Sequence, residues 1–308
     1  MKRLFLSILL ISLISTLSLR SKILNDSIPA GKNFSKAIFR LWYPDDYKTV
    51  AGIIILTAGS NADGRGQVDD SLWQELALKH NFALLGCWFT DSPHEDMSIE
   101  SYANAGLGSG QALLDIITRF AAKSGHSSMA GAPLLLWGHS AGGQFNYEFA
   151  CWKPERVIAF VVNKGGFYYT ALAPKQARNV PGLFFTGETD LDARRDIIKG
   201  IFSMNRRAGA LWAFAEEPGT GHQVGQTKKM TAVFFDEVIP LRAHRNLPGN
   251  DNSAELTLLK ESSGYIGDFK SRIIFPVAEG RRVVYPASWL PGPRSAEAWL
   301  SFVKKIDF

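Results

Sequence analysis

The feature that most constrains the fold is a regular alternation of short apolar runs with longer mixed stretches between residues 37 and 240. The apolar runs predict strands over residues 51–56, 82–89, 133–137, 157–162, 181–185 and 210–215. The mixed stretches predict helices over residues 70–80, 99–123, 141–152, 191–208 and 225–238. Strands that are apolar on nearly every residue are buried on both faces, so the pattern predicts an α/β fold with a mostly parallel central sheet and helices on both faces. Residues 37–43 are predicted to add an antiparallel edge strand.

The N-terminus has the pattern of a secretory signal peptide. Met1-Lys2-Arg3 gives a positive start, and residues 4–19 are apolar apart from Ser and Thr. This run is shorter than the roughly 20 residues of a spanning helix. We therefore expect residues 1–18 to be removed and the protein to be secreted or periplasmic, with no stable membrane partner after cleavage. An uncleaved N-terminal membrane anchor is the alternative.

The rest of the chain divides near residue 243. Residues 19–243 contain the alternating pattern, whereas residues 244–255 are rich in Pro, Gly, Asn and Asp, as a linker would be. Residues 244–308 are predicted to be a C-terminal extension with β-like runs at 272–275 and 282–285 and an amphipathic helix near 296–303. Because about 60 residues of this kind could hardly fold alone, we expect them to pack against the main domain.

Charge and cysteine content exclude several classes of function. Without Lys2 and Arg3, 32 of the 34 basic residues remain against 29 acidic ones, a net charge of +3 with no dense basic run. Nucleic acid is therefore not an expected partner. Cys87 and Cys151 lie in apolar stretches and are expected to be buried free thiols, with a single disulfide as the alternative. No metal-binding motif occurs, and Gly106–Gly110 lacks the preceding strand of a dinucleotide site, so it predicts close helix packing.

The sequence Gly138-His139-Ser140-Ala141-Gly142 carries the strongest chemical signal. It directly follows a predicted strand and directly opens a predicted helix, which is the setting of a nucleophile elbow. Small residues at positions 138 and 142 relieve crowding around the sharp turn. The pattern predicts Ser140 as a nucleophile, and a glycine-rich turn without catalysis is the alternative.

A nucleophilic serine needs a base, and in this arrangement the partners follow in the order Ser, acid, His. That order leaves His222, in the loop after the sixth strand, and His244, which follows a helix and is expected at the surface. His222 is the predicted base, with a surface or capping role as its alternative. His139 adjoins Ser140, but we expect the elbow to turn its side chain away from the site.

The predicted acid follows the fifth strand. Glu188, Asp190 and Asp192 are the carboxylates there, and Asp190 fits a G-x-x-D turn that begins at Gly187. Asp190 is expected to accept the second N–H of His222 and to hold its tautomer. Asp192 is the main rival, with capping of the following helix as its other role.

The predicted oxyanion hole combines two backbone N–H groups. Ala141 follows the nucleophile, and Ser60 lies in the loop after the first central strand. Gly59 permits close approach there. The loop has Ala58-Gly59 where a His-Gly pair is usual, which weakens the assignment of Ser60.

Together, the elbow and the run Pro154-Glu155-Arg156-Val157 resemble the α/β-hydrolase superfamily over residues 50–240. Only residues 163–179 separate the fourth and fifth strands, too few for a large cap domain. The exported chain and the missing cap are similar to the polyhydroxyalkanoate depolymerase and feruloyl esterase-like group. The resemblance implies a serine esterase that acts through an acyl-enzyme without a cofactor or metal.

An open site of this kind suits a small-molecule or polymeric ester. Phe167, Tyr168 and Tyr169 are candidates for its walls, and ordinary packing is their alternative role. Two other functions stay open at this point. The same fold can carry a serine peptidase, or it can serve as a non-catalytic binding protein.

Overall fold

A central eight-stranded sheet organises the computed structural model, which describes residues 21–95, 99–243, 255–282 and 286–305. The predicted signal peptide, His244 and most of the predicted linker lie outside these ranges. The strands, in chain order, are β1 (Ser21–Ile28), β2 (Lys36–Pro44), β3 (Gly52–Thr57), β4 (Phe82–Thr90), β5 (Leu134–His139), β6 (Val157–Asn163), β7 (Gly182–Gly187) and β8 (Trp212–Glu217).

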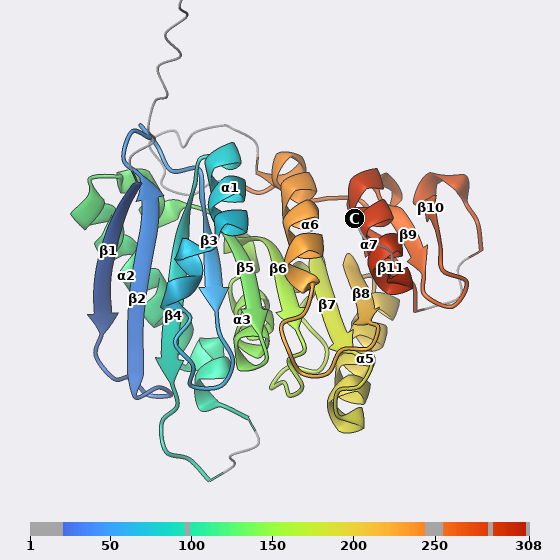
Figure 1. The fold of residues 1–308 in the computed structure, drawn as a ribbon, viewed down its shortest axis with the longest axis horizontal. Helices are drawn as coiled ribbons and strands as arrows, with labels where there is room; N and C mark the ends of the chain where they lie inside the picture. The colour runs from blue at the N-terminus through green and yellow to red at the C-terminus, as the bar shows by residue number, and fades with distance from the viewer. Residues whose placement is uncertain (1–20, 96–98, 244–254, 283–285, 306–308) are drawn as a thin grey trace, which may run out of the picture.

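The spatial order of the strands is β1-β2-β4-β3-β5-β6-β7-β8 (Figure 1). All pairs from β4 to β8 are parallel, whereas β2 pairs antiparallel with β4, and β1 pairs antiparallel with β2. The predicted parallel sheet and its antiparallel strand near one edge are therefore confirmed. The true edge strand, β1, was not predicted, because its residues are only exposed or half-buried and so carry little apolar signal.

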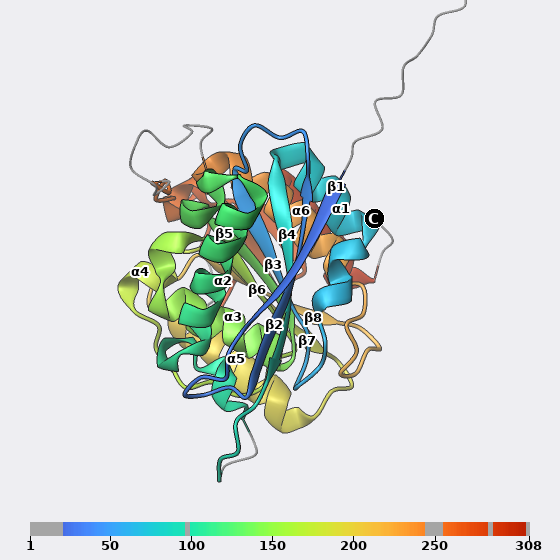
Figure 2. The ribbon, with the colours of Figure 1, turned by 90° about the vertical axis from the view of Figure 1, so that its left-hand side faces the viewer.

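Helices cover both faces of this sheet (Figure 2). On one face α2 (Ser109–Ser124), α3 (Ala141–Trp152) and α5 (Asp192–Arg207) pack over a first apolar core. On the other face α1 (Ser71–His80), α6 (Thr227–Arg242) and α7 (Pro293–Lys304) pack over a second core. Between β6 and β7 only the single-turn α4 (Lys175–Arg178) intervenes, so no large cap domain lies there.

The helix predicted over residues 99–123 begins later than expected. Two 3-10 turns, Ser101–Ala103 and Ala105–Leu107, precede it. α2 starts only after Gly108, because the φ of 144° at this residue is not helical. A Cβ on Gly110 would lie 2.7 Å from the Trp152 ring. The close packing against a helix is therefore confirmed at Gly106 and Gly110, which both face Trp152 of α3, whereas Gly108 faces Asn33.

The C-terminal residues lie against the outer edge of β8. They form a small sheet, ordered β10-β9-β11, from β9 (Tyr265–Asp268), β10 (Ile273–Pro276) and β11 (Ser288–Leu290), followed by α7. The Ser288 hydroxyl accepts from the Phe214 N–H at 2.9 Å and lies 3.0 Å from the Phe214 carbonyl, which also accepts from Trp299 Nε1 at 2.7 Å. Backbone groups that an edge strand would leave open are thus satisfied by side chains.

A buried arginine also ties this segment to the main sheet. Arg206 of α5 donates to the Ala287 carbonyl at 2.9 Å, to the Ala210 carbonyl at 3.1 Å and to Glu261 at 2.5 Å.

The second predicted β-like run, at 282–285, falls almost wholly outside the described residues. No helix among the residues described is long and apolar enough to span a bilayer.

Both cysteines are free thiols. Cys87 is buried in β4 and Cys151 is half-buried in α3. Burial raises the pKa of each thiol, so both stay protonated near neutral pH. The disulfide kept as an alternative does not join them in this structure.

Candidate active site

Ser140 occupies a strained turn between β5 and α3. Its φ of 53° and ψ of −124° are unfavourable for a non-glycine residue and cost about 1–3 kcal/mol. The flanking glycines show what holds the turn. A Cβ on Gly138 would lie 2.4 Å from the Gly142 carbonyl, and a Cβ on Gly142 would lie 2.5 Å from the Ala58 carbonyl oxygen. Backbone segments therefore meet so closely that positions 138 and 142 exclude every side chain.

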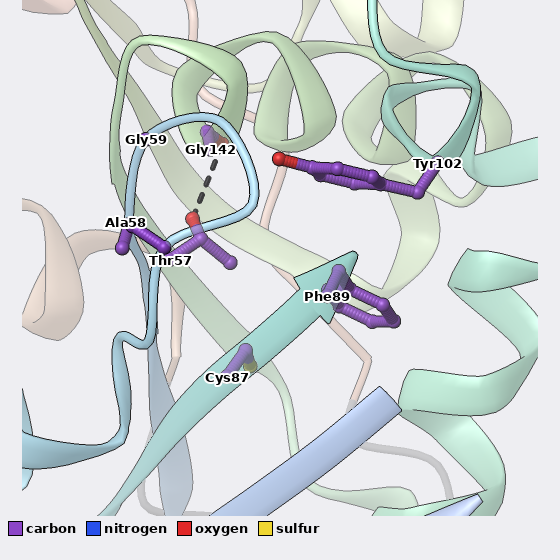
Figure 3. Close-up of a pocket in the computed structure, with 8 residues that line it drawn as sticks. Thr57, Ala58, Gly59, Cys87, Phe89, Tyr102 and Gly142 are labelled. Atoms are coloured by element: carbon purple, nitrogen blue, oxygen red, sulfur yellow. Dashed lines mark hydrogen bonds between the residues drawn. The ribbon is translucent and has the colours of Figure 1, made fainter. Parts of the chain in front are cut away.

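Hydrogen bonds from two neighbouring strands fasten this elbow. The Ser140 N–H donates to the Asn163 carbonyl at the end of β6 at 2.8 Å. The Thr57 hydroxyl, at the end of β3, lies 3.1 Å from both the Trp137 and the Gly142 carbonyl oxygens, as Figure 3 shows for Gly142. The serine is thus placed by buried, uncharged groups of the central strands.

Ser140, His222 and Asp190 form one hydrogen-bonded chain at the carboxyl edge of the sheet. His222 Nε2 lies 3.0 Å from Ser140 Oγ, and His222 Nδ1 lies 2.9 Å from Asp190 Oδ2. Both distances are within the hydrogen-bond range. The rival Asp192 is 89% exposed and pairs with Arg195. Of the three carboxylates after β7, only Asp190 contacts His222 in the structure.

The surroundings of Asp190 keep it ionised. Its second oxygen, Oδ1, accepts from the Leu191 N–H at 2.8 Å and from Arg194. Burial raises the pKa of Asp190, but the hydrogen bonds from His222 and Leu191 and the charge of Arg194 outweigh it and hold the pKa below its usual range. An ionised Asp190 favours the tautomer with the proton on Nδ1, which leaves the Nε2 lone pair facing Ser140.

Arg194 was not foreseen from the sequence. It lies four residues after Asp190, at a spacing that brings side chains together only once the chain is helical there. Its side chain also lies across Gly166, where a Cβ would approach the Arg194 Cγ to 2.3 Å. The four-residue spacing between Asp190 and Arg194 could have indicated this contact, but only if the first residue of α5 had been predicted correctly.

The expectation that the His139 side chain turns away from the site is wrong. The His139 ring centroid lies 5.0 Å from that of His222, and His139 Nε2 lies 2.7 Å from the His222 carbonyl oxygen. The elbow reverses the chain only after His139, so His139 still follows the strand alternation and shares a face with Trp137. That face is covered by α6, and the loop leading into α6 carries His222.

His139 is also held in its uncharged form. Burial lowers the pKa of His139 to about 4, so the ring is neutral near pH 7. A carbonyl oxygen can only accept, and a neutral imidazole carries a single N–H, so that proton must be on Nε2. His139 therefore acts as a donor to the backbone of the loop that carries His222.

The predicted oxyanion-hole residues lie on either side of the elbow. Ala141 is the first residue of α3, where a backbone N–H has no partner within the helix. The loop after β3 closes over the elbow, with Gly59 so near that a Cβ there would lie 3.5 Å from Ser140 Cβ. Ser60 is exposed at the tip of this loop, and its part as a donor stays a prediction.

A small cavity of about 10 Å³ lies beside the loop that follows β3, with room for about one water molecule. Its lining comes from β3, β4, the loop after β3, the 3-10 turn Ser101–Ala103 and the start of α3: Thr57, Ala58, Gly59, Ala62, Cys87, Phe89, Tyr102 and Gly142 (Figure 3). The Tyr102 hydroxyl accepts from the Asn61 N–H at 3.3 Å. Burial raises the pKa of Tyr102, so this phenol remains protonated and supports the loop as a neutral group.

The three candidate wall residues differ in their surroundings. Phe167 and Tyr169 are 37% and 44% exposed. Tyr168 packs edge-on against Tyr147 at 5.0 Å and donates to the Gly165 carbonyl, and the part of all three residues in binding substrate stays a prediction. Within the described ranges, no group of His, Cys, Asp and Glu side chains could hold a metal ion.

No family model matches this sequence, and no curated protein matches it. Solved structures do match its fold. A ferulic acid esterase aligns with a TM-score of 0.53 and 12% identity over 73% of this chain and 99% of its own. The poly(aspartic acid) hydrolase-1 of Sphingomonas sp. KT-1 gives 0.48 and 16% over 69% and 97%, and the poly(3-hydroxybutyrate) depolymerase LpqC of Bordetella parapertussis gives 0.48 and 17% over 68% and 89%. The chain therefore has the α/β-hydrolase fold, as the resemblance implied.

Proposed function

We propose that this protein is a serine hydrolase that cleaves carboxylic esters through an acyl-enzyme. The observation that carries the proposal is the continuous chain from Ser140 to His222 to Asp190, with links of 3.0 and 2.9 Å, on an α/β-hydrolase sheet. The matching ferulic acid esterase, by its name an ester-cleaving protein, supports an ester rather than another acyl substrate.

In the acylation step, Ser140 Oγ attacks the ester carbonyl while His222 Nε2 takes the hydroxyl proton. The ionised Asp190 stabilises the imidazolium that forms. The N–H groups of Ala141 and Ser60 donate to the oxyanion of the tetrahedral intermediate. His222 then returns its proton to the leaving alcohol, the C–O bond of the ester breaks, and the acyl group remains on Ser140.

Deacylation repeats the same proton transfers with water as the nucleophile. His222 removes a proton from a water molecule that attacks the acyl-enzyme, and the oxyanion again faces Ala141 and Ser60. The proton passes to Ser140 as the acid product leaves. Apart from the ester and this water molecule, the proposed steps involve side chains and backbone groups of this chain.

The substrate is proposed to be a bulky or polymeric ester. Only residues 164–181 separate β6 from β7, and within them Phe167 and Tyr169 expose apolar surface near the carboxyl edge of the sheet. Such a site admits a long chain lying across it. We further infer, from the N-terminal pattern, that the enzyme acts outside the cytoplasm after residues 1–18 are removed.

The test compares hydrolysis of p-nitrophenyl acetate and butyrate by the parent and by Ser140→Ala. We expect the parent to be active and labelled by a fluorophosphonate, and the variant to lose activity by about 10⁶-fold, as in other serine hydrolases, and to escape labelling. A parent that cleaves a peptide p-nitroanilide in preference would indicate a peptidase. A folded parent that neither hydrolyses these esters nor reacts would overturn the proposal in favour of a binding protein.

A further inference from the structure

Three consecutive carbonyl oxygens in the loop that carries His222 are each held by a side chain from the end of β5 or β6. The pairs are His139 Nε2 with the His222 oxygen at 2.7 Å, Lys164 Nζ with the Gln223 oxygen at 2.6 Å, and Asn163 Nδ2 with the Val224 oxygen at 3.1 Å. This loop, residues 218–226, contains no helix or strand. These three donors hold its second half, whereas its first half is held by residues directly after β7, where the Thr189 N–H donates to the Thr220 carbonyl at 3.0 Å and Glu188 accepts the Gly219 N–H at 2.6 Å.

The same strand ends also hold the nucleophile. His139 precedes Ser140 directly, and the Asn163 carbonyl accepts the Ser140 N–H at 2.8 Å. Lys164 follows Asn163 and is anchored in turn, because its N–H donates to the Phe185 carbonyl of β7 at 3.0 Å. Ser140 and His222 lie 82 residues apart in the chain, yet both are held by the ends of β5 and β6. We call the three side chains that hold the loop, those of His139, Asn163 and Lys164, the polar frame.

Lys164 is the most unusual member of this frame. Its side chain is completely buried, and its backbone φ is 61°, in the left-handed region that disfavours residues with a side chain. Taking an ammonium out of water costs several kcal/mol unless it is paired. Lys164 Nζ meets that need with Glu217 Oε2 at 2.7 Å. A position that combines both penalties points to a role that simple apolar packing would not fill.

Glu217 extends the same contact along the loop. Its second oxygen, Oε1, accepts the Gln226 N–H at 2.7 Å. Gly225, with φ of 65°, lets the chain wrap around the carboxylate, because a Cβ there would come within 2.1 Å of a Glu217 oxygen. The buried pair of Lys164 and Glu217 therefore holds residues 223 to 226 by a carbonyl at one end and an N–H at the other.

We propose that Lys164 is a positioning residue, which holds the Gln223 carbonyl so that His222 Nε2 stays in line with Ser140. The inference rests on the proposed serine hydrolase function. Lys164 contacts neither Ser140 nor the His222 ring, and it acts through the backbone next to the base. Loss of its ammonium frees this backbone, and a displacement of the base by about 1 Å lowers the rate about 10²-fold.

The competing explanation is that Lys164 and Glu217 merely stabilise the fold. Lys164→Met keeps the length of the side chain and removes the donor, and Lys164→Met with Glu217→Gln also removes the unpaired carboxylate that the single variant would leave. Arg206→Met is a matched control, because Arg206 is likewise a buried cation that binds carbonyls and a carboxylate, but Ala210, Glu261 and Ala287, which it binds, all lie outside the loop 218–226.

The experiment measures kcat and KM for p-nitrophenyl acetate per folded molecule, together with the melting temperature. We expect both Lys164 variants to lose about 10- to 100-fold in kcat with KM within about twofold, even where the double variant melts close to the parent. Arg206→Met should melt earlier and keep its kcat. If the double variant keeps the parent kcat, the pair is only structural and the inference is wrong.

A second readout does not depend on turnover. The proton between His222 Nδ1 and Asp190 gives a downfield NMR signal when the ring is held in place, and His222→Gln assigns it. We expect the signal in the parent and in Arg206→Met, and its loss or broadening in both Lys164 variants. An inactive parent that shows this pattern would overturn the esterase proposal alone, whereas a signal unchanged in both Lys164 variants would overturn the positioning role alone.

Discussion

Ser140 and His222, the two halves of the proposed catalytic pair, are held in position by different kinds of interaction. Ser140 lies where β5 meets α3, and backbone packing at Gly138 and Gly142, together with neutral hydrogen bonds, fixes its position. His222 lies in a loop without regular structure. Side-chain donors, among them the buried ammonium of Lys164, bind the backbone of this loop rather than the His222 ring. Contact between backbones positions the nucleophile, whereas a polar network positions the base.

This difference predicts opposite sensitivities. A close-packed elbow fails when atoms are added, because there is no space for them. A polar frame fails when donors or charges are removed, because the partners left behind are buried and unpaired. Substitutions can therefore be chosen that damage one half and spare the other.

Among the substitutions that compare the two halves, the largest effect is expected from Asp190→Asn. The amide can donate to His222 Nδ1, which would move the ring proton to Nε2 and leave no acceptor for the Ser140 hydroxyl. The kcat should fall by about 10⁴-fold, as it does when the acid of another serine triad becomes an amide. Asp192→Asn is the matched control, since Asp192 is 89% exposed, and should stay within about twofold of the parent. Equal losses in the two variants would contradict the assignment of Asp190.

Gly142→Ala tests the elbow. Its new Cβ would lie 2.5 Å from the Ala58 oxygen, so the loop and the turn must separate. We expect a loss of about 1–3 kcal/mol in the free energy of unfolding and about 10²-fold in kcat. Gly200→Ala in α5, where a Cβ would have no neighbour within 4 Å, should be neutral or stabilising by about 0.4–1 kcal/mol. Urea unfolding and ester hydrolysis of both variants measure the contrast.

His139→Phe tests the polar frame and its response to pH. In the parent, the unfolded chain binds a proton at His139 near pH 6.5, but the folded protein does so only near its pKa of about 4. This contribution to stability is complete above pH 6.5 and is lost as the pH falls toward 4. The variant should lose about 1–3 kcal/mol at pH 7 and about tenfold in kcat, and its stability should depend less on pH between 6.5 and 4. Parallel pH dependences would argue against a neutral buried His139.

The smallest effect is expected from Thr57→Val, which removes a hydroxyl beside the elbow but keeps its shape. The free energy of unfolding should fall by about 1 kcal/mol, and kcat should stay within about threefold, because the close backbone contacts remain. Thr118→Val on the exposed face of α2 should change stability by less than about 0.5 kcal/mol. A loss of kcat in Thr57→Val as large as in His139→Phe would show that the elbow, too, depends on polar groups.

The same difference explains what could be predicted from the sequence. Ser140 was predictable because the elbow is local: a strand, a turn with small residues and a helix follow one another in the chain. Asp190 and His222 followed from their places after consecutive strands. The sheet itself was predictable from apolar runs, apart from β1, whose residues are too exposed to form such a run.

The polar frame was not predictable in this way. The contacts of Lys164, Asn163 and His139 depend on how one irregular loop lies across two strand ends, and no periodic pattern encodes that path. The orientation of His139 depends on whether the chain reverses before or after it, a difference of a single residue. Arg194 likewise depended on the first residue of α5.

The side chains that cover the edge of β8 have a consequence for folding during synthesis. The backbone of Phe214 is satisfied by Ser288 and Trp299, which lie 74 and 85 residues further along the chain. During synthesis, the last strand of the sheet therefore leaves the ribosome with an open edge, at which nascent chains can pair with one another. This edge is covered only once residues 288–299 have been made, so a chain that stops before residue 288 should give a lower yield of soluble protein before the activity of each folded molecule falls.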